Sequence, residues 1–160
     1  MSRSYKQIAF FGISWLWVVG CTDDPVIDED NYQPWVEYWD VREDAETQLY
    51  VDEKQLFRII RLPDEPDVTG SLTDSQVETI DAVLTAPLFE LYEQDSIEGV
   101  NEQADCTVTS ERERVISLRW EERGGGTGEF GCWSDDVDGV ETKRMLAVFE
   151  ELTETLLDGR

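Results

Sequence analysis

The sequence predicts an α+β fold: an antiparallel sheet in a β-β-α-β-β-α order, with two helices packed on one face. Two observations lead to this prediction. Each half of the chain contains β-rich segments joined by short polar stretches, followed by a segment with helical periodicity. In addition, 40% of the 160 residues are hydrophobic, enough for one domain with a packed core. The two halves share no sequence identity that would define a true repeat.

The strands of the first half are expected before residue 63. Residues 35–41 (WVEYWDV) alternate imperfectly between apolar and acidic side chains, which indicates a first strand or an edge segment. Residues 47–51 (TQLYV) and 55–61 (QLFRIIR) are rich in β-forming side chains and flank a polar turn, so they predict a hairpin. Pro63 and Pro66 are then expected to end the sheet.

A helix is predicted after these prolines. In LTDSQVETIDAVL, Thr73 is followed three residues later by Gln76, which is the pattern of a capping box. One apolar stripe runs along this segment, and APLFELY (residues 86–92) is expected to continue as a buried turn.

The second half is expected to repeat this order. Residues 106–110 and 115–120 predict two strands, and residues 129–133 predict a further short strand after a glycine-rich connector. A final helix is predicted with Asp138 as its cap and Gly159 as its stop. Its apolar face comprises Met145, Phe149, Leu152 and Leu156.

The chain is strongly acidic, with 37 Asp and Glu against 13 Lys and Arg and a net charge of −24. Binding to nucleic acid and electrostatic docking on anionic lipid both need clustered basic residues, so this composition argues against both. It fits general solubility or a saline habitat better than a cationic partner. The sequence contains no histidine, which removes Ser-His-Asp and Cys-His nucleophile systems.

The amino-terminal segment has the layout of an export signal. Residues 1–6 carry Arg3 and Lys6 and no acid, and residues 7–19 carry no charge. This apolar run is shorter than the roughly 20 residues of a spanning helix, and acidic residues crowd its far end. A cleaved signal is therefore predicted.

The residues VVGC at positions 18–21 resemble the lipobox of bacterial lipoproteins. The resemblance implies cleavage between Gly20 and Cys21, attachment of a diacylglycerol to Cys21, and acylation of the new amino group. Several acyl chains together hold a protein durably on a membrane. In the sorting rule of enteric-type bacteria, Thr22 directly after the cysteine implies the outer membrane of the cell envelope.

These expectations divide the chain into a signal peptide (1–20), a lipidated cysteine with an acidic tether (21–34) and one α+β domain (35–160). Removal of the signal takes away two cations and no acid, so the net charge changes from −24 to −26. The mature domain also resembles small exported bacterial lipoprotein domains of unknown function, through GSLTDSQVETIDAVL, DCTVTS and FGCW across roughly residues 47–157. That resemblance implies no functional residues.

Cys106 and Cys132 remain once Cys21 is lipidated, an even pair in an oxidising compartment. They predict a disulfide, worth about 3 to 4 kcal/mol in the chain-entropy model. A two-cysteine metal site is the alternative, but the chain has no histidine to complete it and no C-x-x-C spacing.

Two groups of residues are candidate binding sites. The segment SDDVDGVE (134–141) supplies acidic oxygens suited to Ca²⁺, although a capped helix start explains them equally well. The calcium candidates are Asp135, Asp136, Asp138 and Glu141. An exposed aromatic cluster would bind a protein or sugar, and otherwise the same side chains fill the core. The aromatic candidates are Trp35, Trp39, Trp120 and Trp133.

The sequence therefore predicts a lipid-anchored envelope protein that serves as a non-enzymatic interaction or structural module. No cofactor is expected, and the expected partner is an envelope protein or a glycan. GTGEFG (126–131) matches G-x-G-x-x-G, but loop rather than helix follows it, so no nucleotide site is predicted. The alternative function is an envelope hydrolase that depends on carboxylates or calcium.

Overall fold

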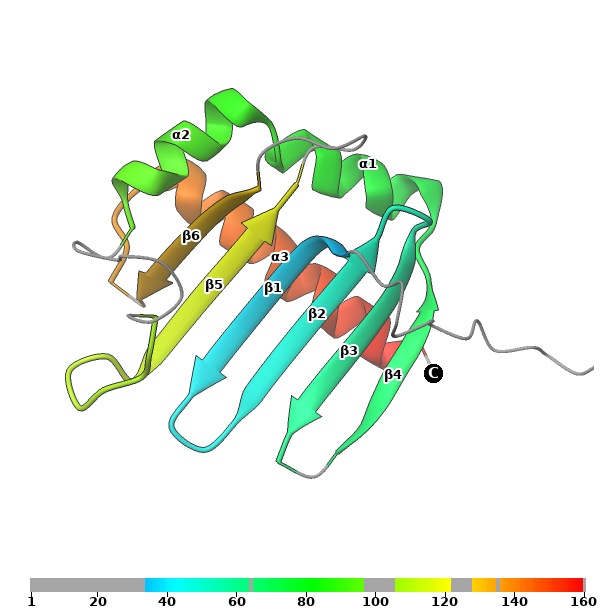
Figure 1. Cartoon of the computed structure of the whole chain (residues 1–160), viewed down its shortest axis with the longest axis horizontal. Helices are drawn as coiled ribbons and strands as arrows, with labels where there is room; N and C mark the ends of the chain where they lie inside the picture. The colour runs from blue at the N-terminus through cyan, green and yellow to red at the C-terminus, as the bar shows by residue number, and fades with distance from the viewer. Residues whose placement is uncertain (1–33, 64, 97–105, 122–127, 135, 160) are drawn as a thin grey trace, which may run out of the picture.

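Six strands form one antiparallel sheet in the computed structural model, which describes residues 34–63, 65–96, 106–121, 128–134 and 136–159. The strands lie in the order β4-β3-β2-β1-β5-β6 (Figure 1). They are β1 (Pro34–Arg42), β2 (Glu46–Asp52), β3 (Leu56–Leu62), β4 (Glu65–Ser71), β5 (Arg114–Trp120) and β6 (Glu129–Ser134). The predicted signal peptide and Cys21 lie outside the described residues.

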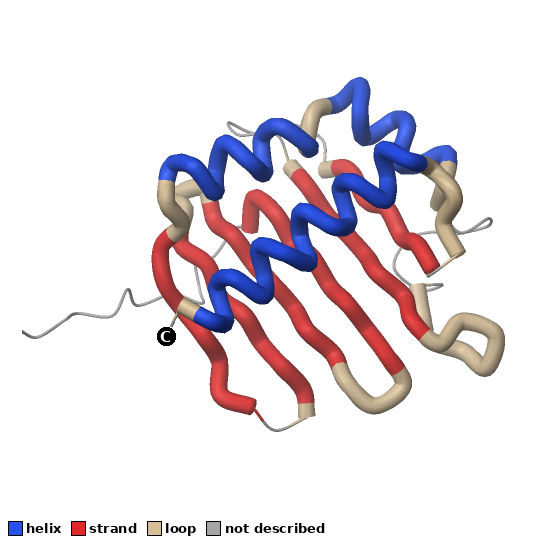
Figure 2. The backbone as a smooth tube through the Cα atoms, turned by 180° about the vertical axis from the view of Figure 1, so that it is seen from behind, coloured by secondary structure: helices blue, strands red, loops and turns tan. Residues whose placement is uncertain are grey.

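Within the described residues, three helices rather than the two predicted cover one face of the sheet (Figure 2). They are α1 (Asp74–Val83), α2 (Ala86–Gln94) and α3 (Val140–Asp158). The α+β class with an antiparallel sheet is confirmed, but the predicted β-β-α-β-β-α order is wrong. Four strands precede α1 and α2, and β5 and β6 precede α3. Within the described part of the chain, no helix combines the length and apolar character that crossing a membrane requires.

Strand β1 lies in the middle of the sheet and pairs antiparallel with β2 on one side and β5 on the other. Its side chains alternate between the two faces. Tyr38 points to the helices, where its ring stacks on Phe149 of α3 with 5.4 Å between ring centroids. Glu37 and Trp39 therefore lie on the opposite side, which we call the helix-free face.

Strand β4 corrects the expectation that Pro63 and Pro66 end the sheet. The chain turns at Pro63, after a cis peptide bond, and re-enters the sheet as an antiparallel partner of β3. Pro66 is tolerated because β4 is an edge strand and because the pairing register shifts opposite its start. Pairing of Arg58 with Asp67 at 2.7 Å places charge on this edge, which discourages further strands from adding to it.

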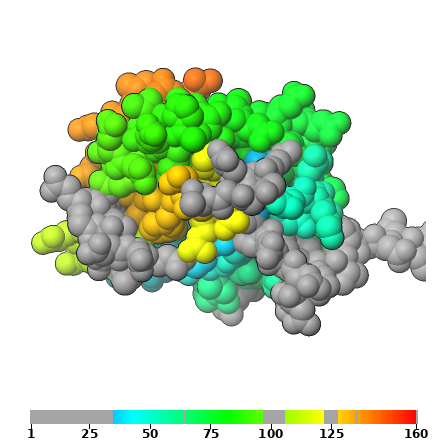
Figure 3. Space-filling model, turned by 45° about the horizontal axis from the view of Figure 1, so that its top comes forward, coloured from blue at the N-terminus to red at the C-terminus, as the bar shows by residue number. Residues whose placement is uncertain are grey.

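Helices α1 and α2 are joined by the short segment at Leu84 and Thr85. The capping box that starts α1 is confirmed: Gln76 N donates to Thr73 Oγ1 at 3.3 Å, and Thr73 N donates to Gln76 Oε1 at 2.8 Å. The predicted buried turn at 86–92 is instead helix α2. Its buried Tyr92 donates its hydroxyl to the Val83 carbonyl at 2.9 Å, which ties α2 back onto α1. Figure 3 shows the two helices, in green, along the top of the molecule, with α2 next to β6.

The N-cap of helix α3 lies one residue later than predicted. The N-cap is Gly139 rather than Asp138, and the Asp95 carboxylate from the end of α2 fills the space where a Cβ of Gly139 would be. The same carboxylate accepts a hydrogen bond from Thr142 Oγ1 at 2.8 Å. The predicted apolar face is buried along most of its length, and Gly159 ends the helix as expected.

Residues 106–110 do not form the strand that the sequence predicts. They are held to the sheet by a disulfide between Cys106 and Cys132 of β6, with 6.1 Å between the Cα atoms. Thr109 and Arg112 close a tight reverse turn by exchanging two backbone hydrogen bonds of 3.0 Å. The segment is therefore attached to the sheet by the disulfide rather than by backbone hydrogen bonds of a paired strand.

Candidate binding site on the helix-free face

The helix-free face carries two rows of side chains that cross neighbouring strands. The pairing register places in one row Phe130, Arg119, Glu37, Tyr50 and Arg58. The next row comprises Cys132, Ser117, Trp39, Gln48 and Ile60. Charged, hydroxyl and amide groups thus lie beside aromatic and aliphatic ones on a face that no described helix covers.

A pocket of about 280 Å³ opens on this face between β1, β5 and β6. Its described lining is Glu37, Trp39, Val41, Cys106, Val115, Ser117, Arg119 and Phe130. The disulfide places Cys106 at the wall, because Cys132 lies opposite Ser117 in the β5–β6 pairing. We refer to this cavity as the Trp39 pocket.

The orientation of Trp39 is fixed by its neighbours on β2. Its ring meets the ring of Tyr50 edge to face, with 6.5 Å between centroids. The Tyr50 hydroxyl donates to Gln48 Oε1 at 2.7 Å, and Gln48 donates in turn to Glu46. Burial raises the pKa of Tyr50, and the Trp39 indole N–H near its hydroxyl opposes the rise. That N–H is buried and has no acceptor of good geometry.

The Trp39 pocket also contains a loosely held ion pair. Glu37 and Arg119 lie opposite each other on β1 and β5, with 3.9 Å between Oε1 and the guanidinium nitrogen. This distance is beyond a hydrogen bond. Burial raises the pKa of Glu37; Arg119 opposes the rise and the Glu121 carboxylate adds to it. Perturbed carboxyl groups beside a cavity are frequent at binding sites.

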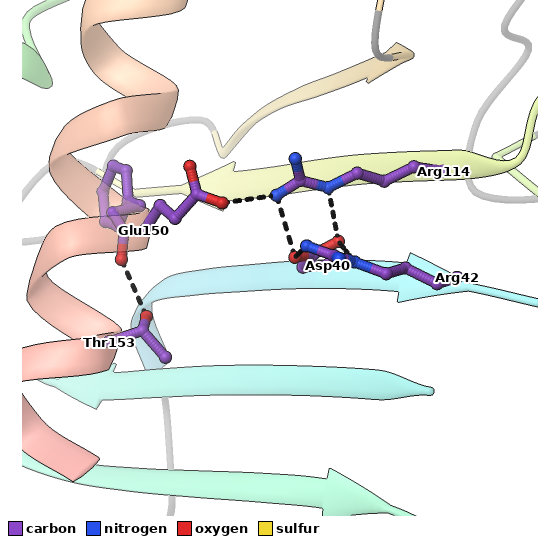
Figure 4. A network of polar contacts seen from close by, with 6 residues as sticks. Asp40, Arg42, Arg114, Glu150 and Thr153 are labelled. Carbon is purple, nitrogen blue, oxygen red and sulfur yellow. Dashed lines mark hydrogen bonds and ion pairs between the residues drawn. The ribbon is translucent and has the colours of Figure 1, made fainter. Parts of the chain in front are cut away.

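A second polar network lies on the helix face and differs in geometry (Figure 4). Arg114 of β5 donates hydrogen bonds to both carboxylate oxygens of Asp40 at 2.8 and 2.9 Å and to Glu150 of α3 at 3.0 Å. Burial acts to raise the pKa of Asp40, but the hydrogen bonds from Arg114 and Arg42 outweigh it and the pKa is lowered. This network joins two strands to a helix, so its role is structural.

The four tryptophans named as binding candidates are separated by the fold. Trp35, Trp120 and Trp133 are buried in the core, at 3%, 5% and 0% exposure, and Trp39 alone of the four lies in the pocket. Trp133 donates its indole N–H to the Tyr92 carbonyl at 2.9 Å. Its ring sits where a Cβ of Gly131 would be, which explains the glycine. No exposed cluster of these tryptophans forms.

The calcium candidates occupy the turn before α3. Asp136 and Asp138 line a polar groove of about 640 Å³ with Asp95, whereas Asp135 lies outside the described residues. Ser134 donates to Asp136 and lowers the pKa of this exposed carboxyl. Glu141 lies in the first turn of α3, with 3.8 Å between its carboxylate and the Arg144 guanidinium. Among the described residues, no three acidic or cysteine side chains converge closely enough to hold a metal ion.

Several pocket residues were not singled out from the sequence: Glu37, Val41, Val115, Ser117, Arg119 and Phe130. The alternation in RVISLRW does place Ser117 and Arg119 on one face of a strand, but the sequence does not show which face the helices cover. No family model, curated protein or solved structure matches this chain. The function is therefore argued from the geometry of the site.

Proposed function

We propose that this chain is a non-enzymatic binding module, tethered to the bacterial envelope by lipid on Cys21, and that it contacts its partner through the helix-free face. The observation that carries the proposal is the Trp39 pocket, where an aromatic wall meets the loose pair of Glu37 and Arg119. Binding sites commonly combine a mostly apolar cavity with a few polar groups. The VVGC motif and the disulfide support an envelope location.

The anchor is tested by the intact mass of the full chain, extracted from membranes of the bacterium that encodes it. We expect a mass that lacks residues 1–20 and carries a diacylglycerol and a third acyl chain. Reduction should add two hydrogens, from the bond between Cys106 and Cys132. Cys21→Ser is the control and should carry no lipid. A membrane-extracted protein that retains residues 1–20 would contradict the proposed anchor.

The binding face is tested by photo-crosslinking in cells. A photoreactive amino acid replaces Ile60, on the helix-free face two strands from Trp39, or Thr79, exposed on α1 at the other side of the sheet. We expect one specific adduct from position 60 that Trp39→Ala weakens, and none from position 79. Specific adducts from position 79 alone would place the partner on the helices and overturn the proposal.

A further inference from the structure

The volume of the Trp39 pocket limits the size of the ligand that it can bind. Sites for drug-sized ligands have volumes of roughly 300 to 1,000 Å³. The pocket has about 280 Å³, so it accommodates one ring or one side chain rather than an extended ligand. Recognition of a larger partner would therefore use one protruding unit at a time.

One side of the pocket is apolar and partly aromatic. Trp39 and Phe130 supply rings, and Val41 and Val115 supply aliphatic surface. The face of an aromatic ring is electron-rich, so it attracts the weakly positive hydrogens of a C–H-covered surface. Because Tyr50 packs against Trp39, the indole is already held in place before a ligand arrives.

The other side presents hydrogen-bonding groups of both kinds. The Glu37 carboxylate can only accept, the Arg119 guanidinium can only donate, and the Ser117 hydroxyl does both. A ligand that accepts and donates through adjacent groups would satisfy this set. Adjacent hydroxyls on a ring have this property.

Charge selects against ionic ligands. Glu37 and Arg119 cancel each other within the pocket, while the chain as a whole carries −24. An anionic ligand would be repelled by the overall field, and a cationic ligand would have to displace Arg119 from Glu37. A neutral ligand avoids both penalties.

We propose that the Trp39 pocket binds a neutral hexopyranose unit of a glycan. This inference rests on the proposed function, because it names the partner of the same helix-free face. A pyranose ring offers a flat C–H face for Trp39 and Phe130 and neighbouring hydroxyls for Glu37 and Arg119. One ring binds weakly, with a Kd on the order of 1 mM, and many tethered copies on a membrane strengthen the attachment to a repeating glycan.

The test uses the full lipidated chain in lauryldimethylamine oxide, a detergent without sugar. Maltohexaose, cellohexaose and chitohexaose are the neutral probes, and hexagalacturonate is the acidic probe of equal length. Binding is followed by tryptophan fluorescence and by saturation-transfer NMR of the sugar protons. We expect at least one neutral hexamer to bind at least tenfold more tightly than hexagalacturonate. Failure of all three neutral probes to bind, or equal binding of the acidic one, would overturn the inference.

Substitutions in the Trp39 pocket test whether the sugar binds there. Trp39→Ala and Arg119→Gln should each lower the affinity for the neutral hexamer at least tenfold, and Trp39→Phe should retain part of that affinity. Arg119→Gln is included because it is expected to fold even if Trp39→Ala does not: the Arg119 side chain is 39% exposed. Leu62→Ala, on the same face outside the pocket, is the matched control and should bind normally. Equal binding by folded Trp39→Ala or Arg119→Gln would also overturn the inference.

The two proposals fail in distinguishable ways. If position 60 forms a Trp39-dependent crosslink to a protein while the folded chain binds no neutral hexamer, the sugar inference is rejected and the binding module stands. If the crosslinks come from position 79 alone, the helix-free face is rejected as the contact surface. A sugar-specific signal that disappears in Trp39→Ala supports both.

Discussion

Two carboxylates three residues apart on β1 lie on opposite faces of the sheet and in opposite electrostatic states. On the helix face, Asp40 receives two hydrogen bonds from Arg114 and has a lowered pKa. On the helix-free face, Glu37 lies 3.9 Å from Arg119 and has a raised pKa. The Asp40 carboxylate accepts its hydrogen bonds from groups within the fold. The Glu37 carboxylate can still accept hydrogen bonds from a ligand.

The difference comes from the number of elements that meet at each site. Arg114 is held by β1 and also by Glu150 of α3, so three elements fix its guanidinium (Figure 4). Arg119 comes from the same strand, and its guanidinium has only the distant Glu37 as a described ion-pair partner. Packing of a helix over one face thus makes an ion pair structural, and the pair on the face that no described helix covers is loose.

The largest expected effect concerns the disulfide, which holds residues 106–110 against the helix-free face. Replacing Cys106 and Cys132 together by Ser should lower the free energy of unfolding by about 3 kcal/mol, because the unfolded chain gains the freedom of a 26-residue loop. Urea denaturation measures this difference. Reduction of the unmodified protein should give the same loss. An unchanged urea midpoint would mean that the bond does not constrain the fold.

The next prediction compares the two arginines of β5 directly. Arg114→Met leaves Asp40 partly buried without its main partner and should cost about 2 kcal/mol, below the full cost of breaking a wholly buried pair. Arg119→Met removes a long, partly exposed pair and should cost about 0.5 kcal/mol or less. Equal losses in urea denaturation at pH 7 would remove the distinction between the faces.

The acid limb of the stability curve tests Asp40. Its pKa is lowered in the fold, so it stabilises the folded state above its ordinary pKa of 3.8, and this contribution is lost as the pH falls below that value through the folded pKa. The stability difference between the unmodified protein and Asp40→Asn should therefore shrink below pH 3.8. A difference that stays constant down to pH 2 would contradict the assignment.

Glu37 should show the opposite sign. Its pKa is raised above the ordinary 4.5, so the folded state retains the proton longer than the unfolded chain, and stability falls as the pH rises from 4.5 through the raised pKa. Glu37→Gln removes this decline and should stabilise the domain at pH 7 by on the order of 0.5 kcal/mol. Thermal melts at pH 4 and pH 7 measure it. Destabilisation at pH 7 would show that the pair with Arg119 outweighs the cost of burial.

The smallest effect is expected from calcium. Asp136 is already bonded to Ser134 and Glu141 lies near Arg144, so the turn before α3 offers scattered rather than converging oxygens. Millimolar CaCl₂ should leave the melting temperature unchanged, with MgCl₂ as the control for ionic strength. A calcium-specific rise that Asp136→Asn removes would restore the turn as a metal site.

Local signals predicted the parts of the fold that local contacts determine. The Thr73–Gln76 capping box and the apolar face of α3 are set by spacing along one helix, and both are present. Strand β4 was missed because Pro66 is excluded from central strands but allowed at an edge, and position in a sheet is not a local property. Helix α2 was missed because its nine residues are too few for a clear period.

The candidate site shows the same limit. Alternation along residues 35–41 indicated a strand but set acidic Glu37 apart from apolar Trp39, whereas the strand geometry puts both on one face. Only the placement of the helices decided which face was left for a ligand. Trp120 and Trp133 resemble Trp39 in sequence context, yet the register of β5 and β6 turns them into the core. Pairing across strands, not composition, separates the one pocket tryptophan from the others.

The central position of β1 has a mechanical consequence. The strand that carries Glu37 and Trp39 is also the first described strand after the proposed acidic tether, so a pull between a bound partner and the proposed lipid anchor would run lengthwise through β1. The hydrogen bonds to β2 and β5 lie across that direction, on both sides of the strand. Under load they would act in shear, sharing the force among many bonds at once instead of opening one after another.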